Sequence, residues 1–219
     1  IDINQKQVTV SLRQKQFNTT IFEENEHWSL EHDMMDSGFG AMYKGLYAFA
    51  KSPQSKRDLL LTINPPQQPE KQEVGIKEDL TEEQQHILGK AIAAKDYFLL
   101  WGPPGTGKTS KMLKHFTQYI LENTKENLLL LAYTNRAVDE ICEAIESIHA
   151  DLKNQYVRIG SKYSTSPKFR ERLLSYKTEQ IERRSELRGI IDGHRIFVST
   201  LSSFTSKQDL LKLKKFHRV

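Results

Sequence analysis

From residue 80 onward, stretches with apolar residues at helical spacing alternate with short, continuous apolar runs. The helical stretches cover residues 80–94, 108–122, 136–149 and most of 168–190. The continuous runs cover residues 97–101, 128–132, 155–159 and 195–200, and they are typical of strands buried on both faces. This alternation predicts an α/β fold in which helices cover a parallel sheet, with ligands bound at the carboxyl ends of the strands.

The first 78 residues follow another pattern. Apolar and polar residues alternate from Val8 to Leu12, which predicts a half-buried strand, and the apolar spacing over 37–52 predicts a helix. The apolar run Asp58–Ile63 predicts a short strand. Three prolines between Asn64 and Glu70 predict an extended linker. We therefore expect a small β/helical segment over 1–63, a linker over 64–78 and an α/β domain over 79–219.

The segment Gly102–Thr109 reads G-P-P-G-T-G-K-T and fits the phosphate-loop pattern G-x-x-x-x-G-K-[ST]. A predicted strand precedes it and a predicted helix follows it, which is the context that the pattern requires. The glycines let backbone N–H groups approach phosphate oxygens, and the helix adds its positive N-terminal end. The sequence thus predicts an ATP site, with cofactor contacts from Gly102, Pro103, Pro104, Gly105, Thr106, Gly107, Lys108, Thr109 and Ser110.

Two residues of this loop are expected to take part in catalysis. Lys108 can reach the β- and γ-phosphates, and the Thr109 hydroxyl can ligate Mg²⁺. Hydrolysis also needs an acidic pair at the end of an apolar strand. Asp139-Glu140 lies within a predicted helix and does not meet that requirement. We expect the pair, behind a further apolar strand, beyond Val219, and we expect this chain alone not to hydrolyse ATP at a useful rate.

The second apolar run leads directly into Thr134 and Asn135, where the next helix begins. These residues have two interpretations. Asn135 could be the N-cap of that helix, with Asp139 in its first turn. Alternatively, Thr134 and nearby N–H groups could hold a nucleic-acid phosphate.

Charge and composition narrow the partners. Residues 151–219 hold 16 Lys and Arg against 7 Asp and Glu, whereas residues 1–150 hold 16 against 21. A basic third on an acidic body suggests a polyanion such as nucleic acid, although a solvated helix face would give the same composition. No run of eighteen apolar residues is present, so we expect no membrane span. The single cysteine, Cys142, excludes a disulfide framework and predicts a buried thiol in a reducing, intracellular compartment.

The motifs together resemble the superfamily 1 helicases, in the 5′-to-3′ branch of the nonsense-mediated-decay and Okazaki-fragment-processing helicases. Leu80–Gln84 looks like the Q motif, Gly102–Thr109 like motif I, Ala132–Asp139 like motif Ia, and Phe197–Ser203 like a later motif of the same domain. Val157-Arg-Ile-Gly160 is also similar to this branch, but we assign it no chemistry. The resemblance covers about residues 78–219. It extends more weakly to Trp28–Asp33 and Lys56–Leu61.

The resemblance implies roles for residues outside the phosphate loop. Gln84 would contact adenine, although Thr81-x-x-Gln84 is also a capping-box pattern. Thr134, Asn135, Thr200 and Ser202 would contact nucleic acid, although Thr200 could be an ordinary strand-end threonine. Residues 79–219 would form most of a first RecA-like motor domain, cut before the Walker B strand. Residues 1–63 would be the end of a β-barrel and a stalk.

The implied function is that of an ATP-dependent helicase or translocase on single-stranded DNA or RNA, working as a monomeric motor in the cytoplasm or nucleus. Two alternatives stay open. A ring-forming, protein-remodelling ATPase often carries the same phosphate loop but does not explain the T-N-x-A-V-D segment within Ala132–Asp139. A nucleotide-gated nucleic-acid-binding module without hydrolysis would share every motif in these residues.

Overall fold

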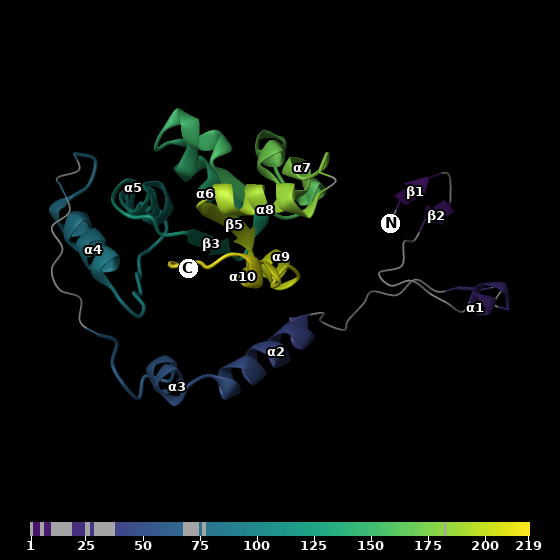
Figure 1. Cartoon of the computed structure of the whole chain (residues 1–219), viewed down its shortest axis with the longest axis horizontal. Helices are drawn as coiled ribbons and strands as arrows, with labels where there is room; N and C mark the ends of the chain where they lie inside the picture. Colours follow the sequence, from purple (N-terminus) through teal and green to yellow (C-terminus); the bar gives the residue numbers. More distant parts are fainter. Residues whose placement is uncertain are drawn as a thin grey trace. The chain divides into compact units, whose positions relative to one another are not determined.

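The computed structural model describes residues 2–4, 7–9, 19–24, 27–28, 38–67, 75, 78–181 and 183–219, and the chain divides into two units, residues 1–39 and 40–219. In the first unit, β1 (Asp2–Asn4) pairs antiparallel with β2 (Gln7–Thr9), and α1 (Thr20–Glu23) follows (Figure 1). The strand expected from Val8 to Leu12 is therefore present over its first residues, and its remainder lies outside the described residues. Residues 29–33 and most of the expected linker, 68–74 and 76–77, also lie outside them.

Two helices occupy the segment before the linker. The expected helix is confirmed as α2 (Gly38–Lys51). The strand predicted over Asp58–Ile63 is wrong, because this segment continues α3 (Gln54–Leu60) and ends in a turn. The Leu61 N–H donates to the Arg57 carbonyl at 2.8 Å, and Leu60, Leu61 and Ile63 are each more than half exposed. The apolar run is thus the end of a helix and not a buried strand.

The second unit contains a three-stranded parallel sheet. Its strands are β3 (Leu128–Ala132), β4 (Tyr156–Ile159) and β5 (Ile196–Thr200), in the order β3-β5-β4. In register, Ala132 lies opposite Thr200 and Ile159 lies opposite Ser199. The sheet confirms the predicted α/β class and three of its four predicted strands. It also brings the carboxyl ends of all three strands to one edge.

Helices connect these strands and flank them. Their bounds are α4 (Glu82–Ala93), π-helix η1 (Lys108–Leu113), α5 (Lys114–Asn123), α6 (Asn135–Glu146), α7 (Leu174–Lys177), α8 (Arg184–Gly193), α9 (Leu201–Thr205) and α10 (Leu210–Leu213), with 3₁₀ turns η2 (Ala150–Asn154), η3 (Lys162–Ser164) and η4 (Pro167–Arg172). The helical stretch predicted over 168–190 is therefore broken into short pieces. No described helix is long and apolar enough to cross a membrane.

Side-chain alternation along the strands gives the sheet two apolar faces. One face packs on α5 and α6 through residues that include Leu128, Leu130, Val138, Ile141, Cys142, Ile145, Ile196 and Val198. The opposite face is covered from α8, α9 and α10, through residues that include Leu129, Val157, Ile191, Phe197, Phe204 and Leu210. Each strand alternates between the two clusters because successive side chains point to opposite faces. The sheet is therefore the middle layer of a three-layer core.

The prediction of a buried strand over Tyr97–Trp101 is wrong. The segment pairs with no strand in the described part of the chain, and Leu99 and Trp101 are 83% and 90% exposed. Strand β3 lies at one edge of the sheet, where a single parallel bridge from Leu128 to Arg218 is found among the described residues. An apolar run forms a strand only where a partner supplies backbone hydrogen bonds.

Arg195, at the start of β5, ties the sheet to the end of α5. Its guanidinium donates to the carbonyl oxygens of Ile120, Leu121, Thr124 and Glu126 at 2.8–3.2 Å. The last carbonyls of a helix have no intrahelical donor, and a cation favours the negative end of the helix dipole. This half-buried arginine therefore caps α5 and fixes it against the central strand.

We expect the Cys142 thiol to be protected by the fold. It is fully buried, and this burial raises its pKa to about 11. Because the thiolate is the reactive form, a disulfide reagent at pH 8 should label the native protein more than about 100-fold slower than an unfolded one. The same protein in guanidinium chloride serves as the control. Equally fast labelling in both states would contradict this packing of α6 on the sheet.

Candidate nucleotide and nucleic-acid sites

The phosphate loop, Gly102–Thr109, is shaped by left-handed backbone at two glycines. The φ angles are +82° at Gly105 and +80° at Gly107, and Gly107 immediately precedes η1. A Cβ at Gly102 would lie 3.0 Å from the Thr106 hydroxyl oxygen, so this position is also crowded. Side chains other than glycine rarely adopt positive φ, which explains the residue types found here. The loop leads directly into η1, and the first N–H groups of a helix have no partner within the helix.

Lys108 lies over this loop. Its ammonium group donates to the carbonyl oxygens of Gly102 and Pro103, at 2.7 Å to the latter. The Thr106 hydroxyl also donates to the Pro103 carbonyl, at 2.9 Å. The cation is thus held against the backbone of the loop. The arrangement fits a polyphosphate, because it combines a fixed positive charge with a helix N-terminus.

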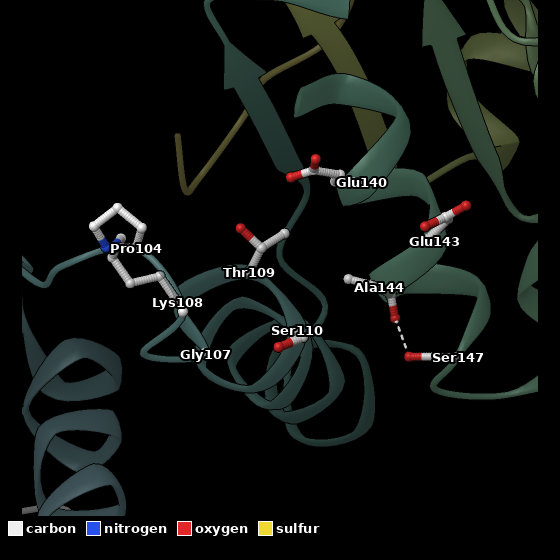
Figure 2. A pocket seen from close by; sticks show the side chains of 10 residues that line it. Pro104, Gly107, Lys108, Thr109, Ser110, Glu140, Glu143, Ala144 and Ser147 are labelled. Carbon is white, nitrogen blue, oxygen red and sulfur yellow. Dashed lines mark hydrogen bonds between the residues drawn. The ribbon is translucent and has the colours of Figure 1, made fainter. Parts of the chain in front are cut away.

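A hollow of about 650 Å³ lies beside the loop, between it and α6. One wall is made by Pro104, Gly105, Gly107, Lys108, Thr109 and Ser110, and the other by Glu140, Glu143 and Ala144 of α6 and by Ser147, its C-cap. Figure 2 shows Thr109 and Glu140 on facing walls of this hollow. Asp139, by contrast, forms an ion pair with Arg158 and does not line the hollow. Only one member of the rejected Asp139-Glu140 pair therefore faces the loop.

A second hollow, of about 410 Å³, lies between the loop and α4. Its lining includes Gln84, Ile87, Trp101, Pro103 and Lys108. The capping box predicted at Thr81 is confirmed, since the Thr81 N–H donates to Gln84 Oε1 at 3.1 Å and the Gln84 N–H donates to Thr81 Oγ1 at 3.2 Å. The Gln84 amide nitrogen also donates to the Thr106 carbonyl at 3.4 Å. Gln84 therefore caps α4 and faces the phosphate loop at the same time.

The predicted nucleic-acid residues lie at the carboxyl edge of the sheet, at or just after the ends of the neighbouring strands β3 and β5. Thr134 caps α6, accepting from the Ala137 N–H at 3.2 Å, so the prediction of Asn135 as N-cap is wrong by one residue. Asn135 is the first helical residue. Thr200 caps α9 through the Ser203 N–H at 3.1 Å and is only 3% exposed. Thr134 and Ser202 are exposed, whereas the Thr200 side chain is enclosed by its own cap.

Comparison with known proteins agrees with this geometry. A family model described as an AAA domain matches residues 79–189. The chain belongs to this AAA domain family. It is 30% identical over 155 residues to an uncharacterised ATP-dependent helicase of Methanocaldococcus jannaschii, covering 69% of this chain and 23% of the relative.

Two further relatives are DNA replication ATP-dependent helicase/nucleases. That of Arabidopsis thaliana is 26% identical over 161 residues, covering 69% of this chain and 12% of the relative. That of Gallus gallus is 26% identical over 196 residues, covering 83% and 19%. The chain thus spans less than a quarter of the length of these relatives. Their names confirm the resemblance to the N-terminal motor region of superfamily 1 helicases.

Several residues of the AAA domain that meet around the loop were missed from the sequence. Glu140, Glu143 and Ala144, with the C-cap residue Ser147, recur at helical spacing, and that spacing places them along one face of α6 and its end. The periodicity could have indicated the face, but not that it is turned toward the loop. For Arg158, the sequence showed only that Val157–Gly160 is similar to the helicase branch, and it predicted no role. Its burial and its ion pair with Asp139 depend on contacts between β4 and α6 that no local pattern encodes.

The left-handed turn of the AAA domain at Gly107 can be tested by Gly107→Ala. The substitution forces a Cβ into positive φ, 3.2 Å from the Lys111 side chain, and should lower the free energy of unfolding by about 1–2 kcal/mol. The matched control is Gly189→Ala on α8, where a Cβ meets nothing within 4 Å; it should raise the free energy of unfolding by about 0.5–1 kcal/mol. Urea unfolding measures both. Equal effects of the two variants would contradict the turn.

Proposed function

We propose that this chain is the ATP-binding part of an ATP-dependent helicase or translocase that acts on single-stranded DNA or RNA. The observation that carries the proposal is the phosphate loop with Lys108 held over it, beside a sheet edge that gathers Thr134 and Ser202. The family match and the names of the relatives support the same reading.

In this proposal the residues around the loop have separate roles in binding the nucleotide. The N–H groups from Gly105 to Thr109 and the Lys108 ammonium hold the phosphates, and Thr109 offers its hydroxyl to Mg²⁺. A bound Mg²⁺ would neutralise charge that develops on the transferred phosphoryl group. Gln84 lies where the base of the nucleotide would enter the hollow beside α4. Its amide can both donate and accept, as recognition of an adenine edge requires.

Hydrolysis by this chain alone is expected to be slow. Asp139 and Glu140 lie within α6 and not at the end of a strand, so they do not meet the requirement for an acidic pair. Glu140 faces Thr109 across the hollow but is also paired with Arg136 at 3.5 Å, and it is exposed. The acidic pair required to orient water is expected in a strand that pairs with the free edge of β3.

The nucleic acid would lie across the carboxyl edge of the sheet. The N-terminus of α6 carries a partial positive charge there, and the hydroxyl of the exposed Thr134 and the amide of the half-buried Asn135 can meet a backbone phosphate. Thr200 would act by holding the turn that presents Ser202, because its own hydroxyl is engaged in the cap of α9. We further propose that the motor works as a monomer, in the cytoplasm or nucleus.

The central test measures ATP hydrolysis by the full-length protein with and without single-stranded DNA or RNA. Stimulation by either one is expected, and Lys108→Ala should lower the stimulated rate by about 100-fold or more, because a charge placed on the transferred phosphoryl group is lost. Lys111→Ala is the matched control, since this lysine lies one turn away and donates to the Asp79 carbonyl at 2.7 Å. It should keep most of the activity.

The same assay separates the alternatives. A protein that binds ATP and nucleic acid but does not hydrolyse ATP would be a nucleotide-gated binding module. Hydrolysis that is indifferent to both DNA and RNA would overturn the nucleic-acid motor and favour a protein-remodelling ATPase.

A further inference from the structure

Helix α6 takes part in both proposed sites. Its N-terminal residues, Thr134 and Asn135, stand at the carboxyl edge of the sheet. Its second half lines the hollow that it shares with the phosphate loop (Figure 2). A helix of twelve residues is a rod of about 18 Å, so movement at one end is transmitted to the other. The position of α6 on the sheet therefore affects both sites together.

Most contacts that hold α6 are apolar. Val138, Ile141, Cys142 and Ile145 pack into the cluster between α6 and the sheet. Apolar contacts are not directional, so by themselves they specify burial of this face more strongly than the position of the helix along its axis.

One buried polar contact fixes that position near the N-terminal end. Arg158 extends from the middle of β4 and is 1% exposed, and its guanidinium forms an ion pair with Asp139 of α6. The Nε and second Nη groups of Arg158 have no hydrogen-bond partner among the described residues. A buried guanidinium needs a compensating anion, and the Asp139 carboxylate is the one paired with it here. A shift of α6 along its axis would separate the two charges, so the ion pair favours one position of the helix.

The strand side of this contact is fixed by backbone pairing. Arg158 lies opposite Val198 in the parallel ladder between β4 and the central strand β5. At the far end of α6, the Tyr156 hydroxyl donates to Glu146 Oε1 at 2.9 Å, and Arg172 Nε lies 3.3 Å from the same oxygen. The two ends of α6 are thus attached to β4 and its neighbourhood by directional polar contacts. Of these contacts, the one at Asp139 lies between the N-terminal end of α6, at the proposed nucleic-acid site, and the part of α6 that lines the hollow beside the phosphate loop.

We propose that the Asp139–Arg158 ion pair is a positioning contact that couples nucleotide binding to nucleic-acid binding through α6. Neither side chain touches a ligand in this proposal. The pair sets the place of α6, so that occupation of the loop hollow favours the arrangement of Thr134 and Asn135 that receives a phosphate. By linkage, the nucleic acid favours nucleotide binding by the same factor. The inference rests on the proposed function, since it needs both ligands to bind.

The experiment measures a coupling factor in the full-length protein. This factor is the dissociation constant of a non-hydrolysable ATP analogue without a single-stranded oligonucleotide, divided by that with the oligonucleotide at saturation. Oligothymidylate and oligouridylate are used in separate arms. We expect a factor of about 5 or more for the unaltered protein. Asp139→Asn should lower it about threefold or more, while each ligand measured alone changes its dissociation constant less than about twofold.

Matched variants separate positioning from general damage. Asp209→Asn removes the carboxylate of an exposed ion pair with Lys212, 2.7 Å long, and should leave the coupling factor unchanged. Asp139→Glu keeps the charge and should retain more coupling than Asp139→Asn. Because Asp139→Asn leaves a buried charge unpaired and can fail to fold, the double variant Asp139→Asn/Arg158→Met removes both charges at similar volume. It should fold and should show the same reduced coupling.

The outcomes are distinct. An unchanged coupling factor in the folded double variant overturns the proposal, as does a factor of one in the unaltered protein that binds both ligands. Failure of the unaltered protein to bind either ligand would instead overturn the proposed function.

Discussion

Pairing of β5 with β3 on one edge and with β4 on the other is the interaction on which the α/β unit depends. All five residues of β5 are buried, so its backbone groups must find their partners within the protein. The two ladders supply those partners, and their parallel register brings three strand ends to one edge. Arg195 extends the same constraint to α5 by capping its last carbonyls from the start of β5. The helices that carry the phosphate loop and the sheet-edge residues are positioned by this one strand.

The secondary structure of this unit could be predicted where a segment needs only local contacts, or where another strand of the chain pairs with it. The runs at 128–132, 155–159 and 195–200 are apolar because both faces of the sheet are covered, and they form strands. The equally apolar Tyr97–Trp101 does not, because strand formation depends on a paired backbone as well as on composition. The strand predicted over Asp58–Ile63 is wrong for a related reason. Short apolar runs occur at exposed helix ends as well as in buried strands.

The turn of the loop Gly102–Thr109 and the helix start after it could be predicted because their residue types occupy consecutive positions. Glycines permit positive φ, and a lysine and a threonine follow at the helix start. The other wall of the hollow, and the pair formed by Asp139 and Arg158, depend on how α6 lies on β4, nineteen residues further along the chain. Thr134 and Thr200 could be predicted in part. Their placement at strand ends was predicted, whereas the engagement of the Thr200 hydroxyl in a cap follows from the turn that the structure adopts.

The outer edge of β3 has a consequence for handling the protein. Alternate residues of β3 direct their backbone groups to this edge, where the described residues supply one bridge, from Arg218, and the apolar side chains of Leu99 and Trp101 are also exposed. Such an edge is a template for strand addition between molecules. In concentrated solution, this chain by itself should be prone to aggregate through intermolecular β-pairing, and any segment that occupies the edge would act as a solubilising element as well as a structural one.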